Sequence, residues 1–343
     1  MSKTIILGQT TSFLLSTVIL ENLRYCGFNI IDISFDEDRF KYRNYRQRAH
    51  NFFRKTFLGD KRFKVNLRIN DFEEGILKKI DLIEGKAEFA LLIRPDMYSD
   101  KILLKLKSKA KLLIGYQWDG LNRFPTVFGV INYFDRFFVF DSNDLNYRKK
   151  ELLYLTNFYF DLPEILNIDE KIEEEIYFVF TYSLQRLNEL NLFLDKIATI
   201  NIKKNIFVYV KNKELSELNN KIYTPIAKTL TYKENIRNVK KASVLLDFNN
   251  RIHNGLSFRT FEAICFEKKL VTNNKTIKHF DFYHPQNVFV LGEDDEQNLS
   301  KFMKSDYIKI DERIKKKYCF SNWINFVLDI QPNTPITLAD MNN

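Results

Sequence analysis

Residues 247–272 read DFNNRIHNGLSFRTFEAICFEKKLVT, and this stretch decides the predicted fold. The apolar run 243–247 predicts a strand, residues 248–257 a polar loop, 258–266 a helix and 270–272 a second strand. A strand, a crossover helix and another strand in close succession are typical of a parallel sheet with helices on its faces. The segment is therefore expected to belong to an α/β domain.

The loop in this stretch has the chemistry of an anion-binding site. Gly255 permits a tight turn, and Ser257 is a favourable N-cap for the helix that follows. The free N–H groups and the positive dipole end of that helix would then face the loop and attract an anion. Arg259 could bind a phosphate through two hydrogen bonds, and Glu262 could accept hydrogen bonds from two vicinal hydroxyls, as a ribose offers. An ordinary capped helix with an exposed arginine and glutamate is the alternative interpretation.

The same alternation of strands and helices extends along the chain. Strands are expected at 4–7, 29–35, 88–94, 111–116 and 134–140, with helices at 13–24 and 99–108. A second series has strands at 176–180, 205–210 and 287–291 and a helix at 184–200. The acidic residues 162–175, interrupted by Pro163, indicate a linker. We predict domains at 1–162 and 170–310, followed by a C-terminal helix and tail at 311–343 that could pack back on the first domain.

Composition narrows the class of protein. A chain of 343 residues suffices for two domains, and 53 Lys and Arg against 44 Asp and Glu give a formal charge of +9. This charge favours anionic partners, namely nucleotides, phospholipid surfaces or nucleic acid. The basic and aromatic residues at 39–56 form either a solvated amphipathic segment or a patch that faces a membrane or an acceptor.

Several sequence patterns are absent, and their absence excludes other classes. The three cysteines form no C-x-x-C pair, which fits a reducing compartment. There is no G-x-x-x-x-G-K-[ST] loop, and no G-x-G-x-x-G follows the first predicted strand, which argues against P-loop enzymes and dehydrogenases. The four histidines lack zinc-site spacing, so no structural zinc is predicted. No apolar run approaches the roughly 20 residues of a membrane helix.

A family resemblance follows from these residues. The pattern Gly255-Leu-Ser-x-Arg-x-x-Glu262-Ala, with the basic turn and apolar strand after it, resembles the donor-binding loop, helix and strand of GT-B glycosyltransferases. It is most similar to bacterial enzymes that build lipopolysaccharide or capsular polysaccharide. Residues 232–247 and 177–186 resemble other parts of their C-terminal domain, and Trp118-Asp119 with 134–144 resembles their N-terminal domain. The resemblance implies the GT-B fold, in which two Rossmann-like domains face each other across a cleft.

The resemblance also implies roles for particular residues. Glu262 matches the glutamate that holds the nucleotide ribose, and the diphosphate-binding loop is matched by Gly255, Leu256, Ser257 and Arg259. Tyr232, Ser183 and Arg186 fall in the other matching segments and are predicted to contact the donor nucleotide, as is His253 in the loop. Many retaining members carry a second glutamate eight residues before the first, where this chain has Asn254. The anomeric outcome is therefore left open.

The catalytic group is expected in the first domain. If transfer inverts the sugar, a carboxylate facing the cleft must take the proton of the acceptor hydroxyl. Asp119 is the first candidate because it follows a predicted strand, and Asp96 is the second. A turn-forming aspartate beside a core tryptophan is an equally good interpretation of Asp119. Asp141 and Asp144 are expected to shape a turn.

The predicted function is transfer of a sugar from a nucleotide-sugar donor to a bacterial surface glycan or its lipid-linked precursor. No metal or cofactor is expected, since positive helix ends and Arg259 would stabilise the departing phosphate. The expected location is the cytoplasm, with attachment to the inner face of the cytoplasmic membrane left open. The alternatives are a non-enzymatic basic nucleic-acid-binding protein, for which no recognised motif is present, and a polyol-phosphate transferase of the same fold.

Overall fold

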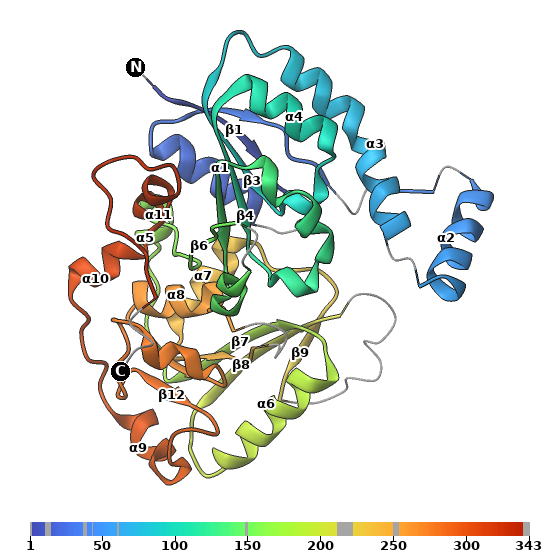
Figure 1. The fold of residues 1–343 in the computed structure, drawn as a ribbon. Coiled ribbons are helices and arrows are strands. Elements are labelled where there is room, and N and C mark those ends of the chain that lie inside the picture. Colours follow the sequence, from blue (N-terminus) through green and yellow to red (C-terminus); the bar gives the residue numbers. More distant parts are fainter. Residues whose placement is uncertain are drawn as a thin grey trace. The chain divides into compact units, whose positions relative to one another are not determined.

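The computed structural model describes residues 2–10, 15–36, 40–42, 44–59, 62–147, 150–210, 222–249 and 254–338. The chain divides into two compact units, Met1–Leu155 and Thr156–Asn343. Each unit contains a six-stranded parallel sheet with helices around it (Figure 1). The predicted α/β class with two Rossmann-like units is confirmed.

Unit 1 has the strand order β2-β1-β3-β4-β5-β6, in which every described neighbouring pair is parallel. Its strands are β1 (Thr4–Gly8), β2 (Asn29–Asp32), β3 (Ala87–Ile93), β4 (Ala110–Gln117), β5 (Arg136–Val139) and β6 (Leu153–Tyr154). Its helices are α1 (Leu15–Tyr25), α2 (Tyr45–Phe57), α3 (Arg62–Asp81) and α4 (Asp100–Lys109). The central strands are buried on both faces, which explains their continuous apolar sequence.

Two glycines allow aromatic side chains to pack directly on the sheet of unit 1. A Cβ atom at Gly8 would lie 2.6 Å from the hydroxyl oxygen of Tyr98, and one at Gly115 would lie 2.8 Å from Cδ2 of Phe137. Tyr98 and Phe137 are both fully buried in the core of this unit. Close approach of the aromatic rings therefore requires a residue without a side chain at both positions.

Unit 2 has the strand order β12-β11-β10-β7-β8-β9. Its strands are β7 (Glu175–Thr181), β8 (Lys203–Tyr209), β9 (Thr224–Ile226), β10 (Val244–Asp247), β11 (Lys269–Thr272) and β12 (Val288–Val290). Its helices are α5 (Pro163–Leu166), α6 (Leu184–Lys196), α7 (Tyr232–Lys241), α8 (Phe258–Cys265), α9 (Leu299–Lys304), α10 (Glu312–Lys317) and α11 (Phe320–Val327). Strands β10 and β7 are paired neighbours at the centre of the sheet, so their carboxyl ends lie at the same edge.

The prediction of a single helix around 311–328 is wrong, because the structure has two helices there, α10 and α11. Tyr159 N donates to the carbonyl of Tyr318, and Phe320 N donates to the carbonyl of Tyr159, so the chain is extended between α10 and α11. Cys319 then caps α11 by accepting a hydrogen bond from Asn322 N. Helix α11 packs within unit 2, where Trp323 Nε1 donates to the carbonyl of Thr156 at 2.9 Å.

Candidate functional site

The start of α8 lies at the carboxyl edge of the unit 2 sheet. Ser257 is the N-cap: its Oγ accepts from Arg259 N at 3.1 Å and donates to Asp247 Oδ2 at 2.7 Å. Asp247 ends β10, so this serine ties the helix start to the end of a central strand. The predicted N-cap and the predicted strand-loop-helix arrangement are both present, and the free N–H groups of the helix point to the loop.

The loop before α8 is held by two asparagine side chains. Asn274 Nδ2 donates to the carbonyl of Gly255 at 3.2 Å, and Asn157 Nδ2 donates to that of Leu256 at 3.0 Å. The side chain of Leu256 is buried, so this residue contributes an anchor to the loop. His253, which was predicted to contact the donor, lies outside the described residues.

Arg259 and Glu262 form a buried ion pair one helical turn apart. Arg259 Nη1 lies 3.0 Å from Glu262 Oε2, and only 12% and 4% of the two side chains is exposed. The pair is close enough for charge attraction, yet these two atoms make no hydrogen bond within the described residues. The two atoms are therefore held by their opposite charges and not by an aligned hydrogen bond.

Helix α7 and strand β7 supply the other partners of this pair. Asn235 Nδ2 donates to Glu262 Oε1 at 3.1 Å, while Asn235 Oδ1 accepts from Arg259 Nη2 and from the hydroxyl of Tyr177, both at 3.0 Å. The guanidinium of Arg259 also lies over the Tyr177 ring, 4.9 Å from its centroid. Tyr232, the first residue of α7, is buried beside Phe160, with ring centroids 4.9 Å apart.

Burial governs the protonation of these groups. Burial raises the pKa of Glu262, while the charge of Arg259 and the amide of Asn235 oppose the rise. For Arg259 burial acts to lower the pKa, but the charge of Glu262 outweighs it and the pKa is raised. Burial also raises the pKa of the Tyr232 hydroxyl. The arginine is thus charged, and its charge favours the ionised form of the glutamate.

The structure brings together only some of the predicted donor residues. Ser257, Arg259, Glu262 and Tyr232 surround the start of α8, and the carbonyls of Gly255 and Leu256 belong to its loop. Ser183 instead caps α6, where its Oγ accepts from Arg186 N at 3.3 Å. Helix α6 follows β7, which pairs with β10, so Ser183 and Arg186 belong to the same sheet edge as the start of α8 but to a different helix.

The two candidate catalytic aspartates lie in unit 1, where each is bound by an arginine. Asp96 is buried and accepts two hydrogen bonds from Arg94, at 2.8 and 2.9 Å. Asp119 follows β4 and lies 2.6 Å from Arg123 Nη1, with its side chain 16% exposed. Arg94 contacts both oxygens of Asp96, whereas Arg123 contacts Oδ1 of Asp119. Both assignments stay predictions.

One further carboxylate at the edge of the unit 1 sheet has an unusual environment. Asp144 Oδ2 accepts from Leu121 N at 2.9 Å. Burial raises the pKa of Asp144 to about 6, and the charge of Asp141 adds to the rise. Asp141 caps the short 3-10 helix Ser142–Asn146, which agrees with the turn-forming role expected of these aspartates.

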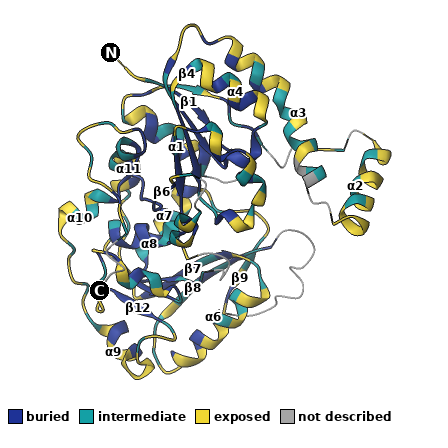
Figure 2. Ribbon diagram, viewed as in Figure 1, coloured by how far each residue is buried: buried dark blue, intermediate teal, exposed yellow. Residues whose placement is uncertain are grey.

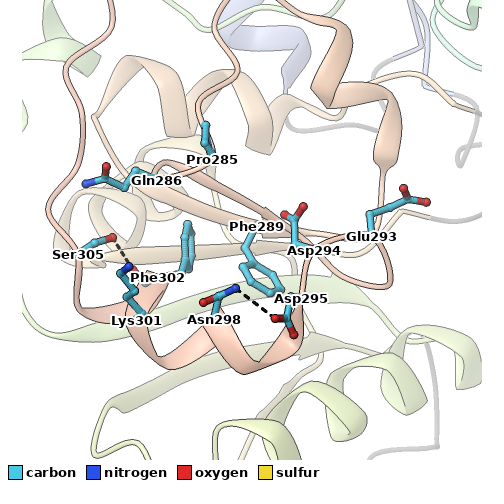
Figure 3. A pocket seen from close by; sticks show the side chains of 10 residues that line it. All are labelled: Pro285, Gln286, Phe289, Glu293, Asp294, Asp295, Asn298, Lys301, Phe302 and Ser305. Carbon is cyan, nitrogen blue, oxygen red and sulfur yellow. Dashed lines mark hydrogen bonds between the residues drawn. The ribbon is translucent and has the colours of Figure 1, made fainter.

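A hollow of about 660 Å³ lies elsewhere in unit 2, beside β12 and α9 (Figure 3). Its floor includes Phe289 and Phe302, and the acidic residues Glu293, Asp294 and Asp295 lie around it. Asp294 is engaged by Lys278 Nζ and Val290 N, both at 2.7 Å. An excess of carboxylates disfavours a diphosphate, and no predicted site residue is among those that line the hollow.

Sequence reasoning missed Asn235, Tyr177 and Asp247 as members of this site. Their residue types carry no signal of their own, since an asparagine three residues into a helix usually faces solvent. Only the packing of α7 and β7 on α8 shows that they contact Arg259, Glu262 and Ser257.

Comparison with known proteins supports the fold. No family model and no curated protein sequence matches the chain. Among solved structures, the lipopolysaccharide outer core galactosyltransferase WaaB in its apo form has a TM-score of 0.53 at 11% identity, over 95% of this chain and 99% of that one. A solved structure described as trehalose-6-phosphate from E. coli bound with UDP-2-fluoro glucose has a TM-score of 0.59 at 10% identity, over 97% of this chain and 100% of that one.

A third structure, an α,α-trehalose-phosphate synthase (UDP-forming) from Burkholderia xenovorans in complex with glucose-6-phosphate, has a TM-score of 0.61 at 10% identity, over 96% and 100%. The resemblance to GT-B glycosyltransferases inferred from the sequence is thus confirmed for the fold. At such identities the similarity extends no further than the fold.

Replacing Arg259 with methionine should destabilise the protein in a pH-dependent manner. Removing one partner of a buried pair costs about 3–5 kcal/mol. Without the arginine, the already raised pKa of Glu262 rises further. A carboxyl whose folded-state pKa is above its unfolded value loses stability as pH rises through the folded pKa. The deficit in the free energy of unfolding should therefore be small near pH 4 and grow up to pH 8, as urea titrations would measure.

The matched control is the double variant Arg259→Met with Glu262→Gln, which removes both charges. Its stability should depend less on pH than that of the single variant. Equal pH dependence in the two variants would contradict a charged Glu262 as the source of the effect.

Proposed function

We propose that this protein is a metal-independent glycosyltransferase that moves a sugar from a nucleotide-sugar to a bacterial surface glycan, lipopolysaccharide or capsule. The observation that carries the proposal is the buried Arg259–Glu262 pair at the N-terminus of α8. It combines a cation for phosphate with a carboxylate for hydroxyls, at the edge of a parallel sheet where such folds bind ligands. The choice of substrate class rests on the sequence resemblance to enzymes that build lipopolysaccharide or capsular polysaccharide, and the likeness to solved structures supports the fold.

In the proposed donor site, different groups bind the diphosphate and the ribose of the nucleotide. The diphosphate would accept hydrogen bonds from the free N–H groups of α8 and from Arg259, and the ribose hydroxyls would donate hydrogen bonds to Glu262. As the sugar leaves, negative charge grows on the diphosphate, and the helix end with Arg259 would stabilise it. These groups would supply the stabilisation that a metal ion provides in other transferases. Among the described residues, no group of three or more His, Cys, Asp or Glu side chains could hold a metal ion.

The acceptor would be activated by a carboxylate of unit 1. Asp119 remains the first candidate because it follows the central strand β4 and is partly exposed, whereas Asp96 is held on both oxygens by Arg94. A base must reach the proton that it removes, so partial exposure favours Asp119.

We also propose peripheral attachment to an anionic membrane through α2. No residue of α2 is buried. Most of this helix is coloured as exposed in Figure 2. Tyr45, Ala49, Phe53 and Phe57 follow each other at intervals of four, and Phe52 lies beside them, which places them on one side of the helix. Phe52 and Phe57 are 64% and 68% exposed.

The charges of α2 suit an anionic surface. The helix contains Arg46, Arg48, Arg54 and Lys55 and no acidic residue. His50 and Arg54 contact Phe63 of α3, with the Arg54 guanidinium 5.0 Å from the ring centroid, so the helix is attached through another side. Exposed aromatic residues flanked by cations are typical of helices that lie in a membrane interface. No described helix meets the length and apolarity needed to cross a bilayer.

Nucleotide binding tests the donor site. Thermal-shift and calorimetric measurements with UDP, GDP, CDP, CMP, ADP and dTDP and their sugar conjugates should reveal one selective nucleotide, because a ligand of the folded state raises apparent stability. Glu262→Ala should weaken its binding about tenfold or more, since each hydrogen bond to a charged group contributes about 1.5–3 kcal/mol. Glu189→Ala, on α6, is a control and should bind normally. Unchanged affinity in Glu262→Ala would exclude the ribose contact.

Turnover tests the candidate base. Asp119→Asn keeps the shape of the side chain and removes its basicity, so kcat should fall by about 10²- to 10⁴-fold while donor affinity stays near that of the wild type. The assay measures sugar transfer through the nucleoside diphosphate that is released. Near-normal turnover of Asp119→Asn would show that another group takes the proton. A product that carries a polyol phosphate would show that the reaction is polyol-phosphate transfer and not sugar transfer.

Sedimentation with vesicles tests the membrane surface. The wild type should bind vesicles that contain phosphatidylglycerol, more strongly at low salt, and bind phosphatidylcholine vesicles weakly. Replacing Phe52, Phe53 and Phe57 with serine should weaken binding at least tenfold, because each buried phenylalanine contributes about 1.5–3 kcal/mol. Leu192→Ser, an equally exposed apolar residue on α6, should have no effect. Salt-sensitive binding of single-stranded RNA in place of vesicles would favour a nucleic-acid surface.

A further inference from the structure

Asn235 joins the two charged residues of the proposed donor site, and the inference that follows rests on that proposed function. Its amide contacts Glu262 Oε1 at 3.1 Å and Arg259 Nη2 at 3.0 Å, and it also accepts from the Tyr177 hydroxyl at 3.0 Å. These contacts come from three elements, namely α7, α8 and β7. One side chain thus fixes the glutamate, the arginine and the tyrosine relative to one another.

Chemistry allows the amide of Asn235 only one orientation. A guanidinium can only donate hydrogen bonds, and an ionised carboxylate can only accept them. The amide oxygen must therefore face Arg259 and the amide nitrogen must face Glu262. Hydrogen bonds to charged partners are stronger than those between neutral groups, so this orientation is held firmly.

The fixed amide determines which atoms of the pair are left for a ligand. Glu262 Oε1 and Arg259 Nη2 are occupied by Asn235, whereas Glu262 Oε2 and Arg259 Nη1 have no hydrogen-bond partner within the described part of the chain. These two atoms lie 3.0 Å apart and face each other as the ion pair. A ribose hydroxyl that donates to the carboxylate and a phosphate that accepts from the guanidinium would therefore bind in competition with this contact.

We propose that Asn235 is the positioning residue of the donor site, and that it holds Glu262 and Arg259 in the orientation in which they bind the ribose and the diphosphate. Its amide fixes Glu262 Oε1 and Arg259 Nη2, while Glu262 Oε2 and Arg259 Nη1 face each other as the buried ion pair. Without Asn235, Glu262 Oε1 and Arg259 Nη2 would lose this shared partner, and the two side chains could turn away from that orientation.

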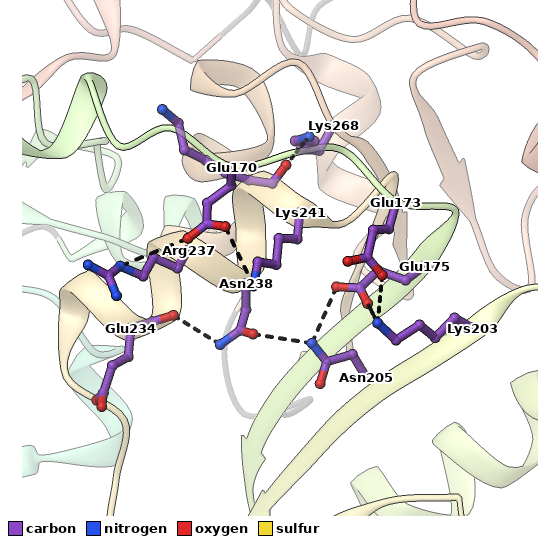
Figure 4. Close-up of polar contacts among 11 residues, drawn as sticks. Glu170, Glu173, Glu175, Lys203, Asn205, Glu234, Arg237, Asn238, Lys241 and Lys268 are labelled. Carbon is purple, nitrogen blue, oxygen red and sulfur yellow. Dashed lines mark hydrogen bonds and ion pairs between the residues drawn. The ribbon is translucent and has the colours of Figure 1, made fainter.

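A second asparagine on the same helix provides a matched control. Asn238 lies one turn after Asn235 and is likewise partly exposed, and it shares the Tyr177 hydroxyl with Asn235 but has its other partners elsewhere. Asn238 Nδ2 donates to the carbonyl of Glu234 at 2.9 Å, and its Oδ1 accepts from Asn205 at 3.2 Å, which in turn contacts the buried Glu175 (Figure 4). The side-chain hydrogen bonds of Asn238 thus go to Glu234, Asn205 and Tyr177, whereas those of Asn235 include both charged residues of the pair.

The experiment measures the Kd of UDP, or of the nucleoside diphosphate selected by the nucleotide screen, in calorimetry from pH 5.5 to 8.5. Asn235→Ala should weaken binding about tenfold to a hundredfold, the range expected for loss of a hydrogen bond to a charged group. Asn238→Ala should stay within about twofold of the wild type. Melting temperatures of all variants show whether each one is folded.

Asn235→Asp provides a readout that a merely structural role would not change. This isosteric variant keeps the acceptor for Arg259 and Tyr177 but places a second carboxylate beside Glu262, so that the two share a proton at low pH. The other titratable groups coupled to Glu262 include Arg259, Tyr232, Asp247, Tyr177 and Cys265, none of which is altered in this variant. The ratio of its Kd to that of the wild type should rise at least tenfold between pH 5.5 and 8.5.

The outcomes separate the two proposals. If no nucleoside diphosphate binds to the folded wild type, the proposed function fails and the role of Asn235 fails with it. If Glu262→Ala abolishes binding while Asn235→Ala binds like the wild type, only the role of Asn235 is overturned. A pH-independent Kd ratio for Asn235→Asp would also overturn it, even if Asn235→Ala failed to fold.

Discussion

Arg259 and Glu262 are opposite charges removed from water together, and the arrangement of α7, α8 and β7 depends on them. Neither charge could be buried alone, because the desolvation of one ion costs several kcal/mol. The pair therefore requires polar partners from every element around it. Asn235 comes from α7 and Tyr177 from β7. The need to satisfy two charges thus fixes how these elements pack on α8.

A buried ion pair is a poor way to gain stability. Apolar side chains of similar size would fill the same space at no desolvation cost, and such replacements are often neutral or stabilising. The pair also lies at the N-terminus of a capped helix, where the backbone favours an anion. A buried cation and carboxylate at such a position are the residue types that the proposed donor site requires.

Unit 1 depends on close packing of aromatic rings against its sheet. Gly8 and Gly115 leave room for these rings because they have no side chain. Its polar groups gather at the carboxyl edge, where Asp96 and Asp119 are held by arginines and Asp144 is buried. Helix α2 lies outside this core and keeps its aromatic side chains exposed. The unit therefore combines a tightly packed sheet with a helix whose aromatic side chains are exposed.

The sequence by itself determined the α/β class with two Rossmann-like units and the helix at 258–265 with its Ser257 cap, because these depend on local patterns. It also singled out Arg259 and Glu262, whose role in donor binding stays a prediction. Apolar periodicity shows strands, and a serine before a helix shows a cap. Only the tertiary structure decided that the arginine and glutamate are buried rather than exposed, that Asn235 joins them, and that the C-terminal helix is broken at Cys319. Each of these depends on side chains far apart in sequence, such as Tyr159 beside Tyr318 and Tyr177 beside Asn235, whose contacts no local pattern encodes.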